Sequence, residues 1–217
     1  MTGHMEREIE KLKRSILALA AVVEESVKQA VIALESNDID LARKIIAGDL
    51  AVNQKEVELE EECLKILALH QPVAADLRFI VAVLKINNDL ERIGDLAANM
   101  ADRVASLSAA KEHEVPFDLS KMADKAELML EKALDALVKF DVNLAYEAIK
   151  LDDVVDNMHK KNFAEIKEEI RQKPKQIDAL ISYLSISRYL ERIADLATNI
   201  AEDVVYLIEG KIVRHIM

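Results

Sequence analysis

The chain has 217 residues and a mass of 24.3 kDa, enough for one large or two small domains that bury a core without disulfides. It contains only 4 Gly and 3 Pro, so the turn residues that a many-stranded sheet needs are missing. With 51% hydrophobic and 32% charged residues, the composition excludes a disordered chain and a membrane-embedded one. The net charge of -11 would repel nucleic-acid phosphates. We therefore expect an all-α globular protein that does not bind nucleic acid.

Helix breakers divide the chain into six segments. Ser36-Asn37-Asp38, Gln71-Pro72, Asp141 and Lys173-Pro174 are typical of tight turns, and residues 106–118 form a longer connection. The predicted helices are 6–36, 39–70, 73–107, 119–139, 142–172 and 175–209. Because short connections force neighbouring helices to run antiparallel, we expect helical hairpins on both sides of the longer connection.

The second half of the chain repeats the first. The apolar stripe from Ile80 to Leu107, with steps of three and four residues, recurs 100 positions later in the sixth predicted helix. The start of the second helix, Asp38-Ile-Asp-Leu-Ala, corresponds to Asp141-Val-Asn-Leu-Ala at the start of the fifth. We therefore predict two similar antiparallel three-helix bundles, over residues 1–107 and 119–217, joined by a linker over 108–118.

A pair of acids lies within each copy of the striped helix. Glu91 and Asp95 in the third helix correspond to Glu191 and Asp195 in the sixth. Residues four positions apart share a helix face, so the two carboxylates of each pair project together at the margin of the core stripe. Such a pair is mutually repulsive unless a positive charge intervenes.

The preceding helix of each hairpin carries matching polar residues. Asp49 and Asn53 are as far before the turn at Pro72 as Asp95 and Glu91 are after it, and Asp152 and Asp156 relate to Asp195 and Glu191 in the same way. The expected clusters are Asp49, Asn53, Glu91 and Asp95 in the first half and Asp152, Asp156, Glu191 and Asp195 in the second. Clustered oxygen donors favour a cation, with Mg, Mn, Ca or iron preferred over a structural zinc site. Because Asn53 is neutral where its counterpart is Asp156, we expect the first site to bind more weakly.

Other interpretations remain open at this point. Arg92 and Arg192 stand beside the acids, so the clusters could be ordinary solvated faces with ion pairs, as in a purely structural interaction protein. His159 follows Asp156 by three residues and is either a surface residue or a member of the second site. A metal-dependent phosphohydrolase is a further alternative, although neither a Gly-rich phosphate loop nor a Gly-x-Ser-x-Gly motif is present.

The chain resembles the PhoU family of phosphate-transport accessory and regulatory proteins over nearly its whole length. The resemblance rests on Asp76-Leu-Arg, Asp89-Leu-Glu-Arg-Ile-Gly-Asp, Arg188-Tyr-Leu-Glu-Arg-Ile-Ala-Asp-Leu-Ala-Thr-Asn and the ending Val205-Tyr-Leu-Ile-Glu-Gly-Lys-Ile-Val-Arg-His. It implies paired three-helix bundles whose acidic motifs hold metal ions, with iron, zinc, magnesium or manganese as candidates. The implied ligands are Glu91 and Asp95 with Asp49, and Glu191 and Asp195 with Asp152 and Asp156.

The same resemblance implies a function. A member of this family would be a cytoplasmic, non-enzymatic negative regulator of phosphate uptake and phosphate-regulon signalling. Its expected partners are subunits of the phosphate ABC transporter and a sensor histidine kinase, so it would reach the membrane through partners only. A homodimer is also expected.

Overall fold

The computed structural model describes residues 2–107 and 119–213, and this part of the chain is almost entirely helical, without strands. The predicted all-α class is therefore confirmed. The first half consists of α1 (Thr2–Ser36), α2 (Ile39–His70) and α3 (Ala74–Leu107). The second half consists of α4 (Leu119–Lys139), α5 (Val142–Ile149), α6 (Asp152–Gln172), the short 3-10 helix η1 (Pro174–Gln176) and α7 (Ile177–Glu209). The predicted linker over 108–118 lies outside the described residues.

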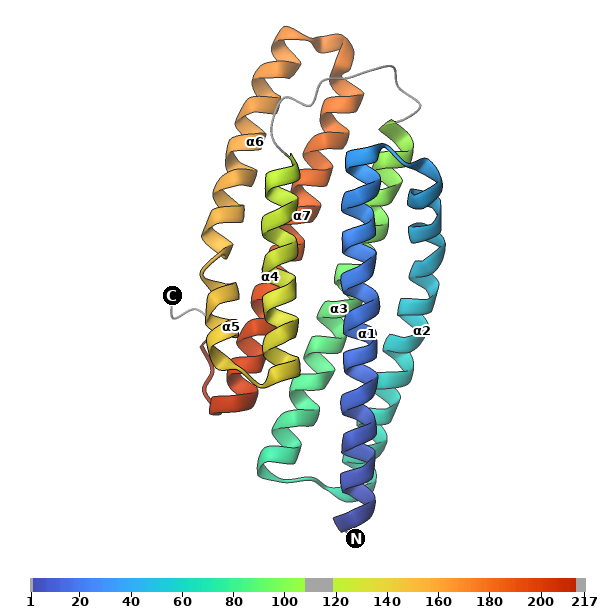
Figure 1. Ribbon diagram of the computed structural model, residues 1–217, viewed down its shortest axis with the longest axis vertical. Coiled ribbons are helices and arrows are strands. Elements are labelled where there is room, and N and C mark those ends of the chain that lie inside the picture. The colour runs from blue at the N-terminus through green and yellow to red at the C-terminus, as the bar shows by residue number, and fades with distance from the viewer. Residues whose placement is uncertain (1, 108–118, 214–217) are drawn as a thin grey trace.

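The central contact of the molecule is between α3 and α7. These two helices pack against each other, α1 and α2 pack against α3, and α4, α5 and α6 pack against α7 (Figure 1). The predicted apolar stripes are buried: from Ile80 to Val104 and from Leu180 to Val204 every stripe residue lies in the core. The buried residues of both halves form one continuous hydrophobic cluster. None of the helices in the described part of the chain is long and apolar enough to cross a membrane.

The turn after the first helix of each half, between α1 and α2 and between α4 and α5, is built in a similar way. Asp38 caps α2 by accepting a hydrogen bond from the Leu41 backbone N–H at 2.9 Å, and Asp141 caps α5 through the Asn143 N–H at 2.9 Å. The residue before each cap has a left-handed backbone, with φ of 51° at Asn37 and 52° at Phe140. The duplication seen in the sequence is therefore also a duplication of turn geometry.

The prediction of one continuous helix over 142–172 is wrong. The helix is interrupted at Lys150 and Leu151, where Leu151 N–H bonds to Ala148 O at 3.0 Å and Val154 N–H bonds to Leu151 O at 3.0 Å. These are tight i to i+3 bonds of the 3-10 type. No Pro or Gly marks this joint, whereas α2 continues unbroken through Gly48, the residue of the first repeat that corresponds to Leu151. The break makes Asp152 and Asp153 the first turn of α6, where helix N-termini favour negative charge.

Candidate metal centres

We use the name acidic seams for the two predicted clusters, each formed where the two helices of a hairpin face each other. In the second seam, ligand oxygens of Asp156 on α6 and of Glu191 and Asp195 on α7 all lie within 4.8 Å of one another. Asp152 lies one turn before Asp156, and its Oδ1 accepts a hydrogen bond from Thr198 Oγ1 at 3.1 Å. The hairpin therefore brings three of the four residues into one group, with the fourth held beside it by Thr198.

The electrostatics of the second seam are those of crowded acids. Asp195 is exposed at the surface, but partial desolvation and then the charges of Glu191, Asp152 and Asp156 raise its pKa to about 6. The pKa of Asp152 is also raised, mainly by burial. The nearby cationic side chains relieve little of the repulsion among these carboxylates. Lys160 Nζ pairs with Asp156 Oδ2 at 3.2 Å on the exposed side. The charge of Arg192 lowers the pKa of Asp195, but its effect is smaller than those of desolvation and of the three acids. A bound cation would remove the repulsion more directly than these side chains do.

The first seam is looser and contains unpaired oxygens. Asn53 Nδ2 donates to Asp49 Oδ2 at 3.4 Å. The buried Oδ1 atoms of Asp49 and Asn53 have no hydrogen-bond partner among the residues that the structure describes. Burial and the charge of Asp95 raise the pKa of Asp49, and burial, Asp95, Glu56 and Asp49 raise that of Glu91. Orphaned buried oxygens of this kind fit a hard cation, which accepts carboxylate and amide oxygens alike.

The two seams differ in how closely the acids converge. Within residues 2–107, the carboxylate oxygens of Asp49, Glu91 and Asp95 do not all lie within 4.8 Å of one another, unlike those of Asp156, Glu191 and Asp195. Close approach of α2 and α3 at this level depends on Gly94, because a Cβ there would lie 3.1 Å from Val52 Cγ1 and 3.7 Å from Asp49 Oδ1. Ala194 occupies the corresponding position in the second half.

One further pair of positions adjoins each seam, and only His159 among these residues is a candidate from the sequence. Glu56 lies one turn after Asn53, and Asn87 Nδ2 donates to Glu56 O at 2.9 Å and to its Oε1 at 3.2 Å. The corresponding residues of the second half are His159 and Ser187, and His159 Nδ1 lies 3.0 Å from Ser187 Oγ. The repeat relationship that links Asp49 to Asp152 also links Glu56 to His159, so the duplication was the signal that could have found Glu56.

The fold and the seams together define a class: a duplicated all-helical protein with an oxygen-rich cluster between the hairpin helices of each repeat. The PhoU domain family profile matches residues 16–104 and 119–204, one match in each repeat. The chain therefore belongs to the PhoU family.

Curated relatives and solved structures agree with this assignment. The chain is 37% identical over 209 residues to "Phosphate-specific transport system accessory protein PhoU homolog 1" of Thermotoga maritima, covering 96% of this chain and 90% of that protein. It is 38% identical over 212 residues to the homologue of Pseudomonas aeruginosa, covering 96% and 87%. The crystal structure of PhoU from P. aeruginosa superposes with a TM-score of 0.91 at 36% identity, covering 95% of this chain and 99% of that chain. The "phosphate transport system regulatory protein PhoU" of Streptococcus pneumoniae gives 0.84 at 33%, covering 96% and 98%.

Proposed function

We propose that this protein is an accessory protein of a phosphate-specific transport system and acts as a negative regulator of phosphate uptake and phosphate-regulon signalling. The observation that carries the proposal is the near full-length match, on both repeats, to relatives named as accessory or regulatory proteins of phosphate transport. In this proposal the protein is cytoplasmic and homodimeric, and it links subunits of the phosphate ABC transporter to a sensor histidine kinase.

The proposed role is that of an adaptor and not of an enzyme. The relatives carry names that describe an accessory or regulatory role in phosphate transport and not a reaction. The long helices of both repeats offer extended surfaces to protein partners. Binding in this way needs shape and charge complementarity over a broad area, not a deep pocket.

The second part of the proposal is that the acidic seams bind metal ions. Asp49, Glu91 and Asp95, with Asn53, would hold a cation in the first seam, and Asp152, Asp156, Glu191 and Asp195 in the second. The orphaned oxygens of Asp49 and Asn53 and the raised pKa of Asp195 support this. A bound cation supplies positive charge there. The residues themselves fix the register of each hairpin and so set the surface that partners contact.

The proposed function is tested by affinity purification of the full-length protein from membranes of cells grown with ample phosphate. We expect mass spectrometry to identify transporter subunits and the sensor kinase, and sedimentation to give the mass of a dimer. A matched variant, Glu191→Gln with Asp195→Asn, should recover less of both partners, whereas Glu168→Gln on the exposed face of α6 should recover as much as the native protein. Recovery of neither partner, or turnover of phosphate esters that Asp195→Asn abolishes, would reject the adaptor role.

A further inference from the structure

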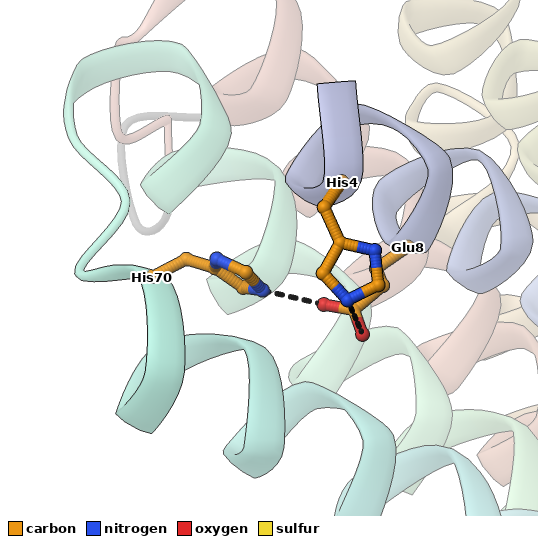
Figure 2. Close-up of side chains that lie close together, drawn as sticks. All are labelled: His4, Glu8 and His70. Carbon is orange, nitrogen blue, oxygen red and sulfur yellow. Dashed lines mark hydrogen bonds and ion pairs between the residues drawn. The ribbon is translucent and has the colours of Figure 1, made fainter. Parts of the chain in front are cut away.

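A group of two imidazoles and one carboxylate lies where α1 begins and α2 ends. His4 and Glu8 are on consecutive turns of α1, and His70 is the last residue of α2 (Figure 2). His70 Nε2 lies 2.6 Å from Glu8 Oε2, and His4 Nε2 lies 3.6 Å from Glu8 Oε1. The two rings meet edge to face with centroids 5.7 Å apart. The carboxylate of Glu8 thus lies between two imidazole nitrogens.

We propose that His4, Glu8 and His70 bind a divalent transition-metal ion of the zinc type, with water as the fourth ligand. Two histidine nitrogens and one carboxylate oxygen are a donor set that zinc uses in four-coordinate sites with an open position. The site differs in chemistry from the acidic seams, which offer oxygen donors. It comes from a different part of the sequence, and it does not depend on the function proposed above.

The distances suit such an ion with small adjustments. Donors about 2.0–2.2 Å from a tetrahedral zinc ion lie roughly 3.3–3.5 Å from one another. One ligand atom from each of the three side chains already lies within 4.8 Å of the other two. The two imidazoles contact different oxygens of Glu8, with 3.6 Å from His4 Nε2 to Oε1 and 2.6 Å from His70 Nε2 to Oε2. The contact from His70 lengthens by less than about 1 Å when the metal takes the place of a shared proton.

The surroundings give the site both support and access. The side chains of Glu8 and His70 are each only 15% exposed, so their positions are restricted by packing, whereas His4 is 65% exposed and leaves a route for the ion. The ammonium group of Lys65, whose Nζ lies 3.9 Å from Glu8 Oε1, opposes metal binding because its positive charge would repel the ion. A bound ion would join the first turns of α1 to the end of α2.

The test is zinc titration of the full-length protein by calorimetry, in a background of Asp95→Asn and Asp195→Asn that weakens the acidic seams. We expect one zinc equivalent to remain. His4→Gln and His70→Gln should each lower the affinity by about tenfold or more. Lys65→Gln should raise it, because a repelling charge is removed, and Glu10→Gln, on the exposed face of α1, should leave it unchanged. Cobalt should give the visible absorption of a four-coordinate site, and His70→Gln should remove it.

His4→Gln is the decisive variant if the other variants fold poorly. It leaves the Glu8 to His70 hydrogen bond in place, and His4 is too exposed for its loss to unfold the bundle. Zinc affinity and cobalt absorption that survive both His4→Gln and His70→Gln overturn the proposal. Loss of the zinc equivalent in His4→Gln, with unchanged helical circular dichroism, supports it.

Discussion

Lys85 Nζ on α3 lies 3.0 Å from Asp203 Oδ1 on α7, and this ion pair joins the two repeats at their central contact. The Asp203 side chain is only 3% exposed, and Lys85 also lies 5.5 Å from the centroid of the Tyr206 ring. The repeat partners of Lys85 and Asp203 are Ser185 and Arg103, so the second half of the duplication has no equivalent of this pair.

Replacing Lys85 with methionine should destabilise the fold. The variant keeps an apolar stem but removes a cation from beside the buried Asp203 carboxylate, so we expect the free energy of unfolding to fall by about 1–2 kcal/mol. Lys139→Met is the control, since it removes an exposed pair with Asp135 within one helix and should have little effect. Urea unfolding measures both. Equal losses in the two variants would contradict the role of the pair.

Gly94 is predicted to be required for the close approach of α2 and α3. Gly94→Ala gains up to about 1 kcal/mol in helix propensity but crowds Val52, and overpacking costs about 1–3 kcal/mol, so we expect a net loss of roughly 1 kcal/mol. The same change in a Val52→Ala background should be neutral or stabilising, because the Cγ1 atom 3.1 Å away is gone. Thermal or urea unfolding of the native protein, the two single variants and the double variant gives the coupling free energy between the two positions. If the stability effects of Gly94→Ala and Val52→Ala simply add, the contact between these two positions does not limit the approach of α2 and α3.

Metal binding to the seams should stabilise the protein in a way that depends on named carboxylates. After chelation, adding Mn²⁺ at about 100 times its dissociation constant should add about 2.7 kcal/mol per site to the free energy of unfolding. Glu191→Gln with Asp195→Asn should remove the contribution of the second seam, and the same changes at Glu91 and Asp95 that of the first.

Asn53→Asp supplies the complementary variant for the first seam. A fourth carboxylate should tighten binding of Mn²⁺ there, while in chelated protein it should lower stability through added repulsion. Calorimetric titration and unfolding with and without chelator measure the two effects. If the variant binds no more tightly than the native protein, the first seam is not a cation site.

The contact between α1 and α4 should make stability depend on pH. Burial and the charges of Glu131 and Asp135 raise the pKa of Glu24, and burial and Asp124 lead the influences that raise that of Glu127. A carboxyl whose folded pKa lies above its unfolded value binds more protons when folded, so its penalty is absent below the unfolded value near 4.5 and grows as the pH rises through the folded pKa.

Glu127→Gln should therefore raise stability at pH 7 and flatten the fall in stability between pH 5 and pH 7. Urea unfolding in chelator at both values measures the slope. Glu10→Gln, at an exposed position on α1, is the control and should keep the slope of the native protein. A slope that Glu127→Gln leaves unchanged would show that this contact does not titrate in the expected range.

Local pattern predicted most of the helices and the levels at which residues of neighbouring helices face each other. The steps of three and four from Ile80 to Val104 predicted which face is buried, because a helix places such residues on one side. The turn at Pro72 predicted which residues of α2 and α3 would face each other, because two helices joined by a short turn run back along one another. Both inferences need only the geometry of one or two helices.

The sequence by itself determined the duplicated helices, their apolar faces and the residues that line each seam, since these depend on periodicity and chain distance. Only the tertiary structure decided that α3 packs against α7, that a helix breaks at Lys150 and Leu151 without a Pro or Gly, and that His4, Glu8 and His70 meet. These features arise from contacts between residues far apart in the chain, or from small backbone adjustments to packing. Neither the long-range contacts nor the backbone adjustments produce a repeating pattern in the amino-acid sequence.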